Sequence, residues 1–203
     1  MTKVSHDGKP PSPGLRERKK AKTRAAIQEH ALRLFQEQGY DATTVEQIAE
    51  AAEVSPSTFF RYFPTKEDVV LYDDLDPLFI AEFEAQPPEL TLIQAMREAM
   101  IAVFTSLSRE EIAKQWERGL LILSVPELRM RFWEQIAESF QLFAAVIAKR
   151  VGRPANDPDV LTFTGALGGA LLAAMFANIN TLQENYAGVI DSALAYLEAG
   201  MPL

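Results

Sequence analysis

The fold of this chain is decided by residues 43–67, which read TTVEQIAEAAEVSPSTFFRYFPTKE. Thr44 is a good N-cap, and Gln47 three residues later completes a capping box, so a short helix is expected to begin here. Ser55 followed by Pro56 marks the start of a second helix, because the first helical position needs no N–H. The spacing predicts two short helices joined by a tight turn.

A longer helix precedes this stretch. It is expected to begin near Arg16 and to end at Gly39, because glycine readily adopts the left-handed conformation that stops a helix. Phe59 and Phe63, four residues apart, are expected to pack on the first two helices. The apolar face of the first helix comprises Ile27, Ala31, Leu34 and Phe35. Three helices in this order predict a tri-helical helix-turn-helix.

The charge of the chain changes along its length. The 203 residues carry a net charge of −8, but the segment up to Lys66 has 11 basic against 8 acidic residues, and the remainder has 9 against 20. Six of the basic residues lie between Arg16 and Arg24. A local basic patch attracts phosphates whatever the total charge, so these residues indicate a nucleic-acid partner. A solvated tail is the alternative interpretation.

The helix that starts at Ser55 has a polar side opposite its phenylalanines. The side chains expected to point away from the core are Ser57, Thr58, Arg61 and Tyr62. Their length and hydrogen-bonding groups suit base edges and phosphates. Free N–H groups at the helix start add an anion site, and Lys66 lies just past the helix end. In the alternative interpretation, Thr44 and Ser55 are helix caps and nothing more.

The rest of the chain is also helical in pattern. Six further helices, most of them longer, are indicated by prolines, by the lack of any alternating strand pattern, and by capping boxes of Thr91 with Gln94 and of Ser108 with Glu111. We predict an all-α protein of about nine helices, the fourth of which bends or restarts at Asp76-Pro77. The expected parts are a disordered tail at 1–15, a helix-turn-helix domain at 16–75 with its motif at about 44–63, and a larger helical domain at 76–203.

The composition disfavours several other classes of protein. With no cysteine and only His6 and His30, little material exists for a metal site or a catalytic triad, so we expect no metal, no cofactor and no enzymatic activity. The carboxylate pairs Glu110-Glu111 and Asp73-Asp74 diverge around a helix and are interpreted as solvated. The first 14 residues lack the apolar run of a signal peptide.

One uncharged segment, between Asp159 and Glu184, is long enough to span a bilayer. Its polar residues and acidic flanks favour a buried helix of a soluble, cytoplasmic protein with no membrane partner. Within it, small residues recur four apart at Gly165, Gly169 and Ala173, which lets another helix approach closely. That helix belongs either to the same subunit or to a second copy.

The motifs TTVEQIA at 43–49 and VSPSTFFRYFPTKE at 54–67 resemble the DNA-binding signature of the TetR family of bacterial transcriptional regulators. The resemblance implies that Thr44 and Lys66 bind phosphates and that Tyr62 contacts the DNA backbone. It also places Pro56, Ser57, Thr58 and Arg61 where the family reads bases or the adjoining backbone. The full set of expected DNA-binding residues is Arg16, Arg18, Lys19, Lys20, Thr44, Gln47, Pro56, Ser57, Thr58, Arg61, Tyr62 and Lys66.

Three residues depart from the family pattern. Phe60 stands where the family usually has a tyrosine whose hydroxyl reaches a phosphate, and Glu46 stands where arginine is frequent. Glu53 replaces a turn glycine at some conformational cost. These departures weaken single contacts without undoing the fold.

The resemblance also implies roles for the remaining helices. The family forms homodimers through its last two helices, here through Gly165, Gly169 and Ala173, and binds a small effector among its middle helices. Candidate pocket residues, which equally suit a plain core, are Phe104, Trp116, Leu120, Phe132, Trp133, Phe140, Met175, Phe176 and Asn178. The expected function is a dimeric repressor that a small, largely apolar effector releases from a pseudo-palindromic double-stranded DNA operator. The competing hypothesis, suggested by Glu46 and Phe60, is a helical ligand-binding or adaptor protein that no longer binds DNA.

Overall fold

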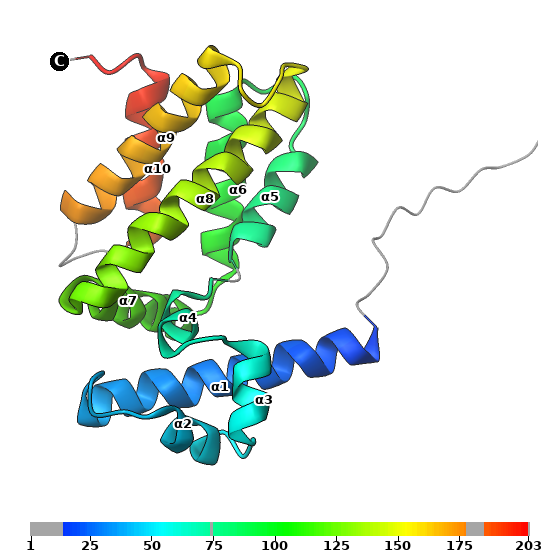
Figure 1. The fold of residues 1–203 in the computed structure, drawn as a ribbon. Coiled ribbons are helices and arrows are strands. Elements are labelled where there is room, and N and C mark those ends of the chain that lie inside the picture. The colour runs from blue at the N-terminus through cyan, green and yellow to red at the C-terminus, as the bar shows by residue number, and fades with distance from the viewer. Residues whose placement is uncertain (1–13, 74, 178–184, 203) are drawn as a thin grey trace, which may run out of the picture. The chain divides into compact units, whose positions relative to one another are not determined.

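The computed structural model describes residues 14–73, 75–177 and 185–202. Over these residues the secondary structure is all-α, as predicted, with ten helices and no strand. The helices in Figure 1 are α1 (Leu15–Gln38), α2 (Val45–Ala51), α3 (Pro56–Tyr62), α4 (Lys66–Leu71), α5 (Leu75–Ala85), α6 (Leu92–Ser106), α7 (Arg109–Ser124), α8 (Pro126–Val151), α9 (Pro158–Ala177) and α10 (Tyr186–Glu198). They form two compact units, an N-terminal unit ending at Val70 and a C-terminal unit beginning at Leu71.

In the N-terminal unit, α1 packs against α2 and α2 packs against α3 (Figure 1). The rings of Phe59 and Phe63 are fully buried, with centroids 6.1 Å apart. They share this core with apolar residues of α1 and α2, namely Ile27, Ala31, Phe35, Ile48 and Ala49. The predicted apolar faces therefore hold α1, α2 and α3 together, and the opposite side of α3 faces solvent.

The fourth expected helix is divided into α4 and α5. Its restart occurs at Leu75, one residue before Asp76, because the Asp73 side chain accepts the backbone N–H of Leu75 at 2.9 Å. Pro77 is the third residue of α5, within the first turn, where proline removes no helical hydrogen bond. This division raises the helix count over the described residues from the predicted nine to ten.

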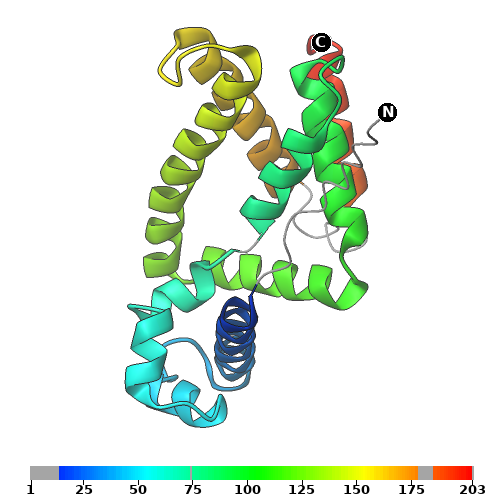
Figure 2. The same cartoon turned by 90° about the vertical axis from the view of Figure 1, so that its right-hand side faces the viewer.

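In the C-terminal unit, α6 contacts α5 and α10, and α9 contacts α8 and α10. Figures 1 and 2 show α7 crossing the end of α8. On the outer side, the Arg97 guanidinium of α6 donates to the carboxylates of Asp191 and Glu198 on α10. The core contains Phe79, Phe83, Met96, Val103, Phe104, Ile147, Leu167, Ile190 and Leu194.

Helix α9 is long and apolar but only partly covered within one chain. Val160, Thr164 and Leu167 are buried, whereas Gly165, Gly169 and Ala173 lie at exposed positions. By length and composition, α9 is able to cross a membrane, and 17% of that span is buried within the chain. The prediction of a buried helix is therefore correct for one side of α9 and, within a single chain, wrong for the opposite side of the helix.

Candidate nucleic-acid interface and internal cavity

The start of α2 is held by two side chains assigned above to DNA. The Thr44 hydroxyl accepts the backbone N–H of Gln47 at 3.3 Å, and the Gln47 side-chain oxygen accepts the backbone N–H of Thr44 at 2.9 Å. Gln38 of α1 donates to the same oxygen at 3.0 Å. Both residues therefore have a capping role. The exposed Gln47 keeps its amide N–H donors for a ligand, because the cap uses the oxygen.

The start of α3 is a cluster of hydroxyl groups. The Ser55 hydroxyl accepts the backbone N–H of Thr58 at 3.1 Å and donates to the Thr58 hydroxyl at 2.9 Å. The Ser57 hydroxyl lies 2.9 Å from that of Ser55. Pro56 occupies the first helical position, as predicted. The cap thus fixes the orientation of the hydroxyl groups at the end of α3 that the resemblance assigns to DNA reading.

The solvent side of α3 differs from the expected one. Ser57 and Arg61 are exposed as predicted, but Thr58 and Tyr62 are half-buried. Each lies one position, about 100° of helix rotation, from the buried pair Phe59 and Phe63. Phe60 is 50% exposed instead, so an apolar ring lies on the face that also presents Pro56, Ser57 and Arg61.

The turn between α2 and α3 carries backbone strain. Glu53 has a φ of +54°, the left-handed region that costs a residue with a side chain about 1 kcal/mol. Its backbone N–H donates to Glu50 and that of Val54 donates to Ala49, which closes the turn. The predicted conformational cost of replacing a turn glycine is therefore visible in the structure.

Lys66 holds the connection between α1 and α2. Its Nζ donates to the main-chain oxygens of Tyr40 at 2.8 Å and Thr43 at 3.2 Å, and it lies 4.0 Å from the centroid of the Tyr40 ring. The Tyr40 hydroxyl donates to Glu67 at 3.1 Å. Lys66 therefore orders the turn before Thr44, and these two carbonyls use two of the three N–H donors of its ammonium group.

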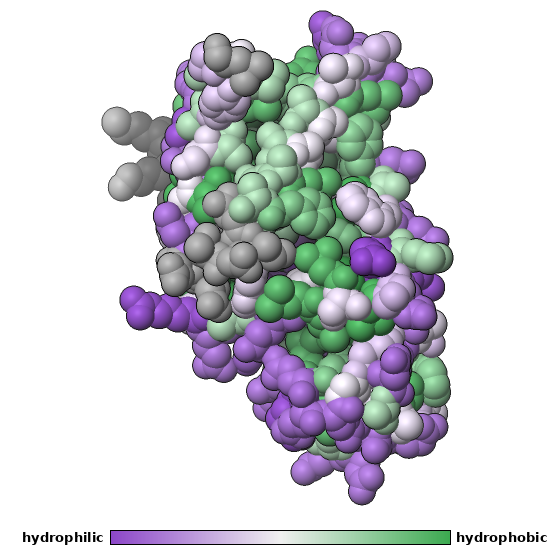
Figure 3. Space-filling model, turned by 90° about the vertical axis from the view of Figure 1, so that its left-hand side faces the viewer, coloured by the Kyte–Doolittle hydropathy of each residue, from purple (hydrophilic) through white to green (hydrophobic). Residues whose placement is uncertain are grey.

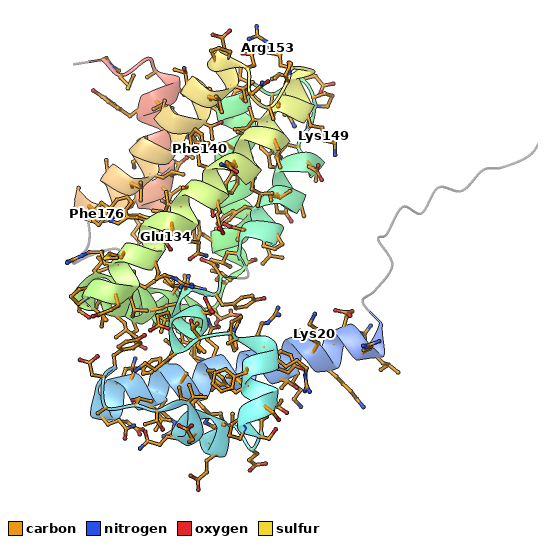
Figure 4. The ribbon with its side chains drawn as sticks, viewed as in Figure 1. Lys20, Glu134, Phe140, Lys149, Arg153 and Phe176 are labelled. Carbon is orange, nitrogen blue, oxygen red and sulfur yellow. The ribbon has the colours of Figure 1, made fainter. Side chains whose placement is uncertain are left out.

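The beginning of α1 is a basic arm, residues 15–24, which is exposed over residues 15–22 and extends past the packed part of the unit (Figure 4). The first buried residue of the helix is Ile27. The arm therefore presents its cations on a helix, and their assignment to DNA, with a solvated segment as the alternative, stays a prediction. Its expected DNA-binding residues, all exposed, are Arg16, Arg18, Lys19 and Lys20.

The C-terminal unit contains a cavity of about 340 Å³, to which α5, α6, α7, α8, α9 and α10 all contribute side chains. Most of the lining is aromatic, methionine or aliphatic. Figure 4 labels two of the lining residues, Phe140 on α8 and Phe176 on α9. Six of the nine expected pocket residues line this cavity, namely Phe104, Trp116, Phe132, Phe140, Met175 and Phe176.

Two of the nine expected pocket residues are corrected by the structure. Leu120 and Trp133 do not line the cavity, and their side chains are 42% and 50% exposed. The preceding residues, Gly119 and Phe132, do line the cavity. Because successive residues of a helix are rotated by about 100°, Leu120 and Trp133 point toward solvent instead. Asn178 lies outside the described residues.

The cavity has a polar end that was not predicted from the sequence. Its lining includes Asp73, Asp76, Arg118, Ser139 and Tyr186. Asp73, interpreted above as a solvated carboxylate, instead accepts a hydrogen bond from Arg118 at 2.6 Å. A sequence signal existed, because Arg118 directly precedes the apolar run of residues 119–123, which is typical of a charge at the edge of a buried surface.

Arg118 of α7 and Gln135 of α8 also hold the end of α4. Arg118 donates to the main-chain oxygen of Tyr72 at 2.8 Å, and Gln135 donates to that of Leu71 at 3.1 Å. The helix therefore ends on two side chains from neighbouring helices. Arg118 and Asp73 also line the cavity, so the residues that follow α4 are linked to the cavity lining through these two side chains.

Burial raises the pKa of two groups at this end of the cavity. Burial and the charge of Asp73 raise the pKa of Asp76, although Ser139 donates a hydrogen bond to its carboxylate at 3.2 Å. Burial also raises the pKa of Tyr186 to about 12, so its hydroxyl stays protonated at neutral pH. Asp76 therefore faces the cavity as a poorly solvated carboxyl group.

Comparison with known proteins agrees with this architecture. Residues 27–72 match the bacterial regulatory proteins of the tetR family, and residues 90–202 match the MftR C-terminal domain. The chain is 39% identical over 196 residues to the HTH-type transcriptional regulator TcmR of Streptomyces glaucescens, covering 91% of this chain and 87% of TcmR. It is 28% identical over 160 residues to MftR of Mycobacterium tuberculosis, covering 77% of this chain and 80% of MftR. The solved SmeT–triclosan complex has a TM-score of 0.57 at 20% identity, covering 88% of this chain and 91% of SmeT.

A helix-turn-helix unit followed by a cavity-bearing helical unit, together with these matches, defines a DNA-binding transcriptional regulator and not an enzyme. The chain belongs to the TetR family.

Proposed function

We propose that the protein is a dimeric cytoplasmic repressor that a small, largely apolar effector releases from a pseudo-palindromic operator. The observation that carries the proposal is that Arg118, which lines the cavity beside Asp73, also donates to the main-chain oxygen of Tyr72, the residue directly after α4. Helix α4 follows the DNA-reading helix α3 after a turn of a few residues. We propose that a change in the occupancy of the cavity reaches α3 along the chain, through α4.

For DNA contact, we propose that Ser57 and Arg61 of α3 meet base edges, since both are exposed and carry hydrogen-bonding groups. Phe60, exposed between them, suits the methyl group of a thymine better than a phosphate. The capped start of α2, Lys66 and the basic arm supply phosphate contacts, which position the protein without reading sequence. Thr58 and Tyr62, being half-buried, act at the edge of this surface.

For release, we propose that an effector competes for the polar end of the cavity. A ligand that binds among Asp73, Asp76 and Arg118 changes the contacts that Arg118 and Asp73 make with Tyr72 and Leu75 at the junction of α4 and α5. The ligand then favours a second position of α4 and so of α3, and its differential affinity for the two positions sets the loss of operator affinity. SmeT, which shares the fold, binds triclosan in its solved complex.

For assembly, the exposed stripe of small residues on α9 supports a dimer. A Cβ atom added at Gly169 meets nothing within 4 Å, so that side of the helix is open in one chain, while Gly165 faces Phe140 of the same chain at 3.7 Å. Figure 3 shows hydrophobic residues gathered over the side of the C-terminal unit on which α9 and α10 lie. A twofold dimer presents two reading helices to half-sites about one DNA turn, or a multiple, apart.

The proposal is tested by binding of the purified full chain to DNA from its own upstream region, measured by fluorescence anisotropy over a range of salt concentrations. If the dimer neutralises about eight phosphates, log affinity falls against log salt with a slope near −7. Failure to bind any palindromic fragment at low salt would overturn the repressor proposal and favour a helical ligand-binding protein that no longer engages DNA.

A further inference from the structure

We infer that the cavity selects an aromatic or polycyclic ligand that carries a hydrogen-bond donor, a hydroxyl or a protonated amine, and that it rejects ligands carrying a carboxylate. The residue that makes this selection is Asp76. The inference rests on the proposed function for the cavity's role as the effector site, and it names the chemical class of the effector.

The first step is the acceptor capacity of Asp76. Its carboxylate receives one hydrogen bond, from the Ser139 hydroxyl at 3.2 Å, and forms no ion pair among the described residues. Two carboxylate oxygens accept about four hydrogen bonds when fully satisfied. A carboxylate that faces an apolar cavity with most of this capacity unused is costly, and a ligand donor offsets that cost.

The second step is that the only cation lining the cavity, among the described residues, is already engaged. Arg118 is bound to Asp73 at 2.6 Å and to the main-chain oxygen of Tyr72 at 2.8 Å. A ligand carboxylate would have to break this arrangement and lie near two acidic side chains. The charges that line the cavity, two aspartates and one arginine, therefore oppose an anion and favour a neutral or cationic donor.

The third step is the shape and chemistry of the walls. The rings of Phe79 and Phe104 lie 5.2 Å apart, and those of Phe104 and Tyr186 lie 4.4 Å apart, so three aromatic side chains form a continuous surface. Ring faces attract flat aromatic ligands and cations. The Tyr186 hydroxyl has no hydrogen-bond partner among the described residues and is available as a second polar contact. A volume of about 340 Å³ lies within the range of small-molecule sites.

The test compares two probes with the same three-ring frame, 9-aminoacridine and anthracene-9-carboxylate, by isothermal titration of the DNA-free full chain. We expect 9-aminoacridine to bind at least tenfold more tightly. Quenching of Trp116, observed in a Trp133→Phe background, shows that the probe occupies the cavity, because Trp116 lines it and Trp133 does not. Equal affinity for the two probes, or tighter binding of the carboxylate, overturns the inference.

The isosteric variant Asp76→Asn assigns the selectivity to one side chain. We expect it to weaken 9-aminoacridine binding about tenfold and to leave or improve the affinity for anthracene-9-carboxylate. Glu138→Gln, which removes the same charge from an exposed position of α8, is the matched control and leaves both affinities unchanged. If Asp76→Asn lost affinity for both probes equally, Asp76 would have a structural role only, and the assignment of selectivity to this side chain would be overturned.

The outcome is separable from that of the proposed function. If 9-aminoacridine binds in an Asp76-dependent way but never alters operator binding, the ligand class holds and the release mechanism fails. If the operator complex forms and anthracene-9-carboxylate dissociates it more effectively than 9-aminoacridine, the repressor proposal holds and the ligand class is wrong.

Discussion

Arg118 and Asp73 form an ion pair of 2.6 Å that joins α7 to the break between α4 and α5. Both side chains are largely covered, with 12% and 26% of their surfaces exposed. The same guanidinium holds the main-chain oxygen of Tyr72, and the other oxygen of Asp73 caps α5. One pair of residues therefore ends one helix, starts the next and forms part of the cavity wall.

We expect Arg118→Ala to lower the free energy of unfolding by about 2–3 kcal/mol, because it leaves the Asp73 carboxylate covered without its partner. Urea unfolding of the C-terminal unit, followed by circular dichroism, measures this loss. Arg131→Ala is the control, since Arg131 pairs with Glu134 at 3.8 Å on the surface, and we expect it to cost less than about 0.5 kcal/mol. Similar losses in the two variants would contradict the structural role of Arg118.

The pKa of Asp76 predicts a pH-dependent effect on stability. Burial raises it, Asp73 raises it further, and Ser139 and Arg118 lower it less strongly. A raised pKa means that Asp76 stabilises the fold while protonated and that this contribution is lost as pH rises through the raised value. We therefore expect Asp76→Asn to be at least as stable as the unsubstituted chain at about pH 7.5, with the advantage fading toward about pH 4. A loss of stability that is constant with pH would contradict this.

The left-handed turn at Glu53 predicts a stabilising substitution. Glu53→Gly relieves a strain of about 1 kcal/mol and loses part of this to the larger unfolded-state entropy of glycine, so we expect a gain of about 0.5–1 kcal/mol. Thermal unfolding of the N-terminal unit measures it. Glu53→Ala removes the carboxylate but keeps the strain, so it is expected to give no gain. An equal gain in both variants would assign the effect to charge and not to backbone conformation.

The exposed stripe of α9 predicts that the dimer depends on Gly169. We expect Gly169→Leu to fold normally, because a Cβ there meets nothing within 4 Å, and to shift the sedimentation coefficient toward that of a monomer. Ala137→Leu adds the same side chain at an exposed position of α8 and is expected to leave the assembly unchanged. A Gly169→Leu protein that sediments as a dimer would place the interface elsewhere.

Local sequence signals located the helix-turn-helix almost completely. The capping boxes at Thr44, Thr91 and Ser108 all form, because each depends only on residues three positions apart. The spacing of aromatic and methionine residues also identified six cavity residues correctly. It does not define which side of a packed helix faces the cavity, so Leu120 and Trp133 were wrongly assigned to the lining. The pairing of Asp73 with Arg118 joins residues 45 positions apart, and no local pattern encodes a contact of that range.

Arg61 and Lys66 are expected to differ in how they contribute to DNA binding. Arg61 is exposed on α3, so Arg61→Ala removes a base contact, costs about 1–3 kcal/mol and relaxes sequence preference at one position of each half-site. Lys66 donates hydrogen bonds to the carbonyls of Tyr40 and Thr43. We therefore expect Lys66→Ala to weaken binding to all DNA sequences alike and to lower the melting temperature of the N-terminal unit.

Selection of bound sequences from random DNA, combined with anisotropy on matched and scrambled sites, measures both effects. Arg109→Ala, which removes an exposed cation at the start of α7, is the control for net charge and is expected to change neither sequence preference nor stability. If Arg61→Ala and Lys66→Ala shifted sequence preference equally, the division into a base-reading residue and a turn-holding residue would be wrong. If Lys66→Ala weakened binding without changing the melting temperature, its contacts with the turn would be secondary to a direct phosphate contact.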